Sequence, residues 1–158
     1  MTPADIRFHS LPEDAVAALR AGGPDAYGAP AERVRSSGRG VPCRCCLQDI
    51  AEGEETLLLA HRPFNELQPY AETGPIFLCA DCAPRPASAA PPPVVAARPE
   101  FLVKAYGDDA RIRYGTGRIT KTEEIPAYCA KLLSEAETAF VDLRSSVNNC
   151  FICRVTRA

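Results

Sequence analysis

Three cysteines fall within four positions, Cys43, Cys45 and Cys46, in the stretch VPCRCCLQDI. A further pair, Cys79 and Cys82, has the same two-residue gap as Cys43 and Cys46. That gap lets both sulfurs of a pair turn toward one point, about 2.3 Å from a tetrahedral zinc ion. If the two pairs share one ion, residues 43–46 and 79–82 must meet in space. No other feature of the sequence constrains the fold as strongly.

The clustered cysteines have two other interpretations. Close thiols also serve redox chemistry, and a free cysteine is often a small buried hydrophobe. Residues 47–78 separate the two pairs, a longer gap than the roughly 15–20 residues of compact zinc sites. An apolar strand and a long loop fill this gap, so closure on one ion remains feasible and we favour metal ligation. Cys45 is then an alternate ligand or a free thiol.

The start of the chain bears on the redox state of these thiols. MTPADIRFHS has no basic segment followed by an apolar core, so we expect no secretory signal and a cytoplasmic location. No apolar run approaches the roughly 18 residues that a membrane-spanning helix requires, so we expect no membrane partner. A reducing cytosol keeps most thiols unpaired, which favours metal ligation or redox chemistry over structural disulfides.

The other cysteines and the two histidines are weaker candidates. Cys150 and Cys153 flank strand-forming residues, and positions three apart on a strand point to opposite faces, so we expect packing roles. Cys129 falls on an apolar helix stripe and is expected in the core. His9 is expected to be structural, whereas His61 ends an apolar run and is a candidate partner for a thiolate or a metal.

The charge of the chain argues against a dedicated nucleic-acid or membrane-surface protein, because the formal net charge is −2. One basic run, Arg33, Arg35, Arg39 and Arg44, is a candidate for binding phosphate or nucleic acid. A solvated loop is the simpler interpretation of that run.

The pattern of apolar and turn residues predicts a mixed fold. Ser10 to Glu13 has the form of a capping box, which predicts a helix of about ten residues ending at Gly22-Gly23. A second helix is predicted over 125–136, where apolar residues recur at intervals of three and four. Strands are predicted at 56–60, 76–78, 101–106, 112–120, 139–143 and 150–155, and a loop at 24–42.

Proline marks one further segment, residues 83–99, which favours extended backbone and is predicted to be a linker or an exposed insertion. The piece after it would be marginal as a separate domain. We therefore predict one α+β domain over 1–158, with a mainly antiparallel sheet, two principal helices and a Pro-rich excursion.

Four stretches carry a resemblance: PCRCCL, LLLAHRPF, LQPYAETGPIFL and the terminal CFICR. Together they resemble a bacterial family known as domain of unknown function 1203, over most of the chain outside its first 40 residues and the Pro-rich segment. The family has no assigned reaction. The resemblance implies that relatives often carry histidine at the positions of Cys45 and Cys79. It therefore favours a metal, adds Cys45 to the candidate ligands and weakens a Cys–His catalytic pair.

Two functions follow from these observations. The first is a structural zinc site, with candidate ligands Cys43, Cys45, Cys46, Cys79 and Cys82, in a small binding or regulatory module. The alternative is a thiol-dependent enzyme or redox protein that uses a reactive Cys45 or Cys46, with Arg44 lowering the thiol pKa.

Overall fold

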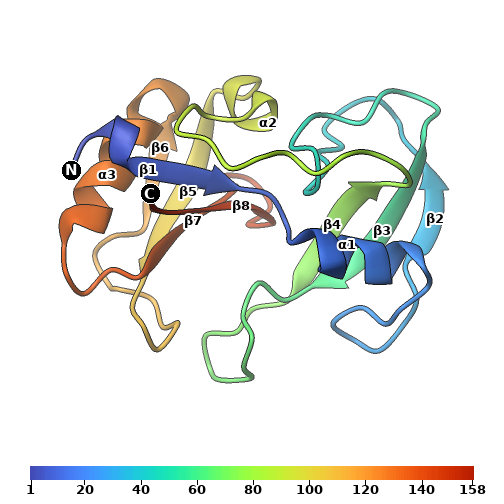
Figure 1. The fold of residues 1–158 in the computed structure, drawn as a ribbon, viewed down its shortest axis with the longest axis horizontal. Coiled ribbons are helices and arrows are strands. Elements are labelled where there is room, and N and C mark those ends of the chain that lie inside the picture. Colours follow the sequence, from blue (N-terminus) through green and yellow to red (C-terminus); the bar gives the residue numbers. More distant parts are fainter.

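The chain folds into two antiparallel sheets that lie side by side within a single α+β domain (Figure 1). The structure is a computed structural model and describes residues 1–158. The larger sheet has the order β1-β8-β7-β5-β6 and the smaller one β2-β3-β4. The strands are β1 Ile6–His9, β2 Glu32–Arg35, β3 Glu55–His61, β4 Gly74–Cys79, β5 Glu100–Tyr106, β6 Arg118–Lys121, β7 Phe140–Ser145 and β8 Phe151–Arg157.

Three α-helices accompany the sheets: α1 Glu13–Arg20, α2 Pro93–Ala96 and α3 Ile125–Ser134. Two short 3-10 helices, Pro3–Asp5 and Thr122–Glu124, precede β1 and α3. None of the helices combines the length and the apolar character needed to cross a membrane. The predicted fold class, with two principal helices and antiparallel strands, is confirmed.

The larger core lies between α3 and the five-stranded sheet. The apolar stripe of α3 buries Ile125, Cys129 and Leu133 completely, as its helical spacing predicted. Pro126 lies in the first turn of the helix, where a missing N–H costs no hydrogen bond. The second predicted helix and the core position of Cys129 are therefore confirmed.

A register shift divides β8 between two cores. Leu143 pairs with Cys153 and Arg144 with Phe151, so Ile152 is the extra residue of a bulge. Phe151 packs into the smaller core, whereas Ile152 and Cys153 pack into the larger one.

Strand β2 lies in the segment 24–42, where the sequence predicted a loop, and that prediction is wrong for Glu32–Arg35. The strand pairs antiparallel with β3 at the edge of the smaller sheet, and Arg33 forms an ion pair of 2.7 Å with Glu55. Its sequence, ERVR, has no apolar pattern because an edge strand facing solvent does not need one.

Helix α1 exists as predicted, but its predicted capping box is wrong. Pro12 occupies the N-cap, and Ser10 Oγ instead donates to the Arg85 carbonyl, 75 positions away in the sequence. The end of the helix follows the prediction. Gly23 N bonds the Ala18 carbonyl, and a Cβ at Gly23 would lie 2.7 Å from that oxygen.

The predicted strand over 112–120 is mostly turn. Only Arg118–Lys121 forms a regular strand, paired with β5, and Ile112 makes a single bridge to Tyr106. Gly115 at φ +87 bends the chain between these points, which breaks the extended backbone that the apolar pattern suggested.

The Pro-rich segment 83–99 crosses from the smaller sheet to the larger one and contains α2 (Figure 1). Val94 and Val95 are buried in the larger core, and Val94 N donates to the Leu47 carbonyl. The prediction that the segment is exposed is therefore wrong around α2, because Val94 and Val95 are buried in the core.

The long β3–β4 loop docks on the polar face of the larger sheet through Glu72. Its carboxylate contacts Lys104 at 3.3 Å and Arg144 at 3.1 Å, and it accepts a hydrogen bond from Asn149 at 3.0 Å. Burial favours a higher pKa for Glu72, but the two cations outweigh it and the pKa is lowered. Glu72 belongs to the stretch PYAETGPIF, so this docking explains one charged residue of that motif.

Replacing Val94 and Val95 together by alanine should lower the free energy of unfolding by about 2 kcal/mol per residue, because each change removes buried methyl groups and leaves a cavity. Urea denaturation measures the loss. The matched control is Val147→Ala, since Val147 is 87% exposed and should change stability by less than about 0.5 kcal/mol. Wild-type stability in the double variant would show that the Pro-rich segment does not contribute to the core.

Candidate metal centre

The first cysteine pair lies in a tight turn held against β4. Cys43 forms a parallel bridge to Phe77, and Arg44 N donates to the Phe77 carbonyl. Leu47 N closes the turn on the Cys43 carbonyl, with Leu47 at φ 53. Such a φ is uncommon for a side chain larger than glycine, and burial of Leu47 in the larger core offsets its cost. We call residues 42–47 the knuckle.

The second pair follows directly from strand register. Cys79 is the last residue of β4 and pairs with Thr56, and the chain then turns so that Cys82 comes back toward the knuckle. Phe77 contacts the knuckle and lies two residues before Cys79, so β4 places the second cysteine pair next to the first. The two pairs therefore meet, as a shared site requires.

Four thiols converge at this point. The Sγ atoms of Cys43, Cys46, Cys79 and Cys82 all lie within 4.8 Å of one another. Cys43 Sγ is 3.8 Å from Cys82 Sγ, and Cys46 Sγ is 3.8 Å from Cys79 Sγ. Four sulfurs at about 2.3 Å from one tetrahedral ion are about 3.8 Å apart, so these distances match a metal tetrathiolate.

Donors surround the sulfurs. Cys43 Sγ accepts from Cys45 N at 3.3 Å and from Cys79 N at 3.2 Å. Arg20, in the last turn of α1, donates to Cys82 Sγ at 3.1 Å and to the carbonyls of Cys79 and Cys82. Four thiolates around a divalent ion carry a net charge of −2, and amide and guanidinium donors stabilise such a charge.

The crowding of the thiols also favours a cation. A hydrogen bond from Cys46 lowers the pKa of Cys43, so the cluster readily carries one thiolate. Hydrogen bonding with Cys43 raises the pKa of Cys46 to about 11 and raises the pKa of Cys79. The negative charge of the first thiolate repels each further thiolate. Complete deprotonation of the four thiols near neutral pH therefore requires a positive charge at the centre of the group.

Cys45 is not part of the four-thiol group, although it lies in the knuckle. Its Sγ contacts the Cys82 carbonyl at 3.9 Å, and its side chain is buried. Two effects raise the pKa of Cys45 to about 12: burial, which is the larger, and hydrogen bonding with Cys82. A nucleophilic thiolate needs exposure and a lowered pKa, so the surroundings of Cys45 are the opposite of those of a reactive thiol.

The other candidates lie outside the group. His61 packs on Phe151 at 5.5 Å between ring centroids, and burial lowers its pKa to about 4. His9 Nε2 contacts Thr156 Oγ1 at 2.8 Å. Cys150 and Cys153 do not join the four thiols: Cys153 is buried in the larger core, and Cys150 precedes β8.

The four arginines of the basic run do not form one surface. Arg33, Arg35 and Arg39 are exposed around β2, whereas Arg44 is 2% exposed and lies between the two sheets. Burial lowers the pKa of Arg44 to about 10, which leaves it charged at neutral pH.

The sequence did not indicate that Arg20 contacts the cysteine group. Its only signal there is a basic residue in the last turn of a helix, which is common and indicates a favourable helix dipole rather than a metal centre.

A family model for a protein of unknown function, DUF1203, matches residues 40–157. The chain belongs to the DUF1203 family. The match covers the knuckle, the β3–β4 loop and the second cysteine pair, and confirms the resemblance seen in the sequence; α1 and Arg20 lie outside it. No curated protein and no solved structure matches the chain.

Alkylation of Cys45 in the folded protein should stay slow from about pH 7 to about pH 9, because a buried thiol with a pKa of about 12 remains protonated throughout. Iodoacetamide labelling followed by peptide mass spectrometry measures the rate, with the half-exposed Cys150 as the internal control. Faster labelling of Cys45 than of Cys150, with a midpoint well below about 8.5, would instead support a reactive thiolate.

Proposed function

We propose that this DUF1203 protein is a binding or regulatory module built around a structural zinc ion, held by Cys43, Cys46, Cys79 and Cys82. The observation that carries the proposal is the convergence of four sulfurs within 4.8 Å, at separations typical of a tetrahedral tetrathiolate. Zinc is proposed because four-sulfur tetrahedral sites select zinc or iron and because zinc needs no redox partner.

A structural role fits the ligand count. Catalytic zinc sites use three protein ligands and keep one position for water or substrate, whereas four cysteines fill a tetrahedron. Cys43 is buried and the other three are partly buried, so the ion has little room for a fifth group.

The metal would stabilise the junction between the two cores. Cys43 packs in the smaller core and Leu47 in the larger one, so the turn between them belongs to both. Binding free energy at a structural site acts as folding free energy, and an ion here would hold the knuckle against the end of β4.

Elemental analysis of the full chain, purified without chelator, should find about one zinc per chain. Cys43→Ala or Cys82→Ala should remove most of the metal and lower the unfolding temperature, because a site with three ligands binds more weakly, and added chelator should reproduce both effects. Two matched controls are Cys45→Ala, also in the knuckle, and Cys129→Ala in the larger core, both of which should keep the metal.

Two results would contradict the proposal. One is a wild-type chain that contains no metal and none of whose cluster thiols is protected from labelling. The other is a Cys45→Ala variant that loses metal as completely as Cys43→Ala. Iron in place of zinc would keep the site and overturn the identity of the ion.

A further inference from the structure

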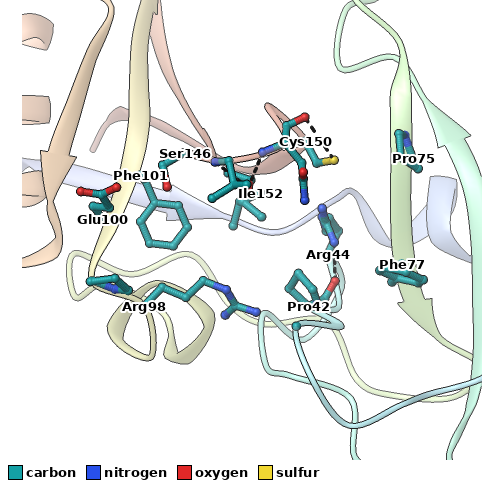
Figure 2. Close-up of a pocket in the computed structure, with 15 residues that line it drawn as sticks. Pro42, Arg44, Pro75, Phe77, Arg98, Glu100, Phe101, Ser146, Cys150 and Ile152 are labelled. Carbon is teal, nitrogen blue, oxygen red and sulfur yellow. Dashed lines mark hydrogen bonds between the residues drawn. The ribbon is translucent and has the colours of Figure 1, made fainter.

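A cavity of about 600 Å³ lies between the two sheets, with β4 on one side and β5 and the β7–β8 connection on the other (Figure 2). Its apolar walls include Phe77, Phe101 and Ile152. Arg44, Ser146 and Asn148 supply polar groups. The volume falls in the range of small-molecule sites, and the mixed lining is typical of them.

Arg44 is a buried cation without an acidic partner in this cavity. Its side chain lies between Pro42 and Cys150 in Figure 2 and is 2% exposed. Nε donates to the Phe151 carbonyl at 2.7 Å and Nη1 to the Pro42 carbonyl at 2.5 Å. Nη2 has no hydrogen-bond partner, and the guanidinium bonds only to the two backbone carbonyls rather than to a carboxylate. A buried charge of this kind is costly unless something of opposite charge approaches it.

A second arginine borders the adjoining cavity of about 180 Å³, which shares Pro75, Asn148 and Cys150 with the first. Arg144 is 3% exposed, and its Nη1 forms an ion pair with Glu72. Its Nε and Nη2 are buried and have no hydrogen-bond partner. His61 Nε2, on a residue lining the same cavity, is also buried and unpartnered. Arg144 therefore places a buried guanidinium, paired with Glu72, in the wall of this second cavity.

Two carboxylates line the cleft formed by these two cavities, Glu72 and Glu100, but neither pairs with Arg44. Glu72 is shared among Lys104, Arg144 and Asn149, and Arg98 on the cavity wall pairs with Asp49 at 2.6 Å. Glu100 lines the cavity near Phe101 and is exposed. Arg44 therefore retains an uncompensated positive charge.

We propose that this cleft binds a small molecule with an anionic headgroup, a carboxylate or a phosphate, and an apolar body. Arg44 Nη2 contacts the headgroup, and the apolar side chains hold the body. Guanidinium groups suit both headgroups because they carry charge and several donors in one plane. The site goes beyond the proposed metal function and uses none of the four clustered thiols.

The probes for a test are benzoate, phenyl phosphate and neutral benzyl alcohol, added to the full-length protein at constant ionic strength. Cys150 is a built-in reporter, because it is half-exposed and lines both cavities. At a probe concentration about ten times the dissociation constant, Cys150 alkylation should slow about tenfold and the unfolding temperature should rise. Protection by benzoate alone assigns a carboxylate, by phenyl phosphate alone a phosphate, and by both a general anion site.

Two variants locate the site. Arg44→Gln should abolish protection of Cys150 by the anionic probes, whereas Arg33→Gln, which removes an exposed arginine of β2, should retain it. If Arg44→Gln does not fold, Asn148→Trp is the second test of the site. Asn148 is an exposed turn residue that lines the cavity, so a tryptophan there should fill the cleft and leave Arg44 in place. This variant should abolish probe binding, measured by calorimetry.

Three results would overturn the anion site: no protection by either anion at millimolar concentration, equal protection by benzyl alcohol, or equal loss of binding in Arg44→Gln and Arg33→Gln. Metal content measured on the same samples keeps the two proposals apart. Unprotected Cys150 with full metal content rejects the cleft, and anion protection without metal rejects only the metal centre.

Discussion

The fold depends on the contact between the knuckle and the end of β4. Cys43 and Cys45 pack in the smaller core, Leu47 packs in the larger one, and the Leu47 carbonyl receives the N–H of Val94. The Pro-rich segment and both sheets therefore meet at one turn of six residues. Five of the six residues of this turn are buried, and four converging thiols around one ion would hold it further.

The same turn links the metal centre to the cleft. Arg44 lies between Cys43 and Cys46, so any constraint on the two sulfurs also fixes the backbone that carries Arg44. Its guanidinium is held further by the carbonyls of Pro42 and Phe151, and thus by both the knuckle and β8. In the two proposals, this turn would hold a structural ion on one side and present a cation to the cleft on the other.

Sequence patterns predicted those parts of the molecule that depend on local periodicity. The stripe of α3 gave a correct expectation for which residues are buried. The matching gaps of the two cysteine pairs predicted a shared ligand set, and the structure brings those four thiols together without Cys45. Tertiary contacts decided the rest: Ser10 bonds Arg85 rather than the helix, β2 is a polar edge strand, and Val94 anchors a segment whose prolines suggested exposure. Arg20 and the unpartnered atoms of Arg144 are visible only once distant segments are brought together.

X-ray absorption at the zinc edge tests the central claim most directly, because it reports the atoms bound to the ion in the intact protein. We expect a first shell of four sulfurs at about 2.3 Å and no nitrogen or oxygen scatterer. A shell with nitrogen at about 2.0 Å would place a histidine at the ion, and a shell with fewer than four sulfurs would leave an open position. Either result would contradict a closed structural site formed by Cys43, Cys46, Cys79 and Cys82.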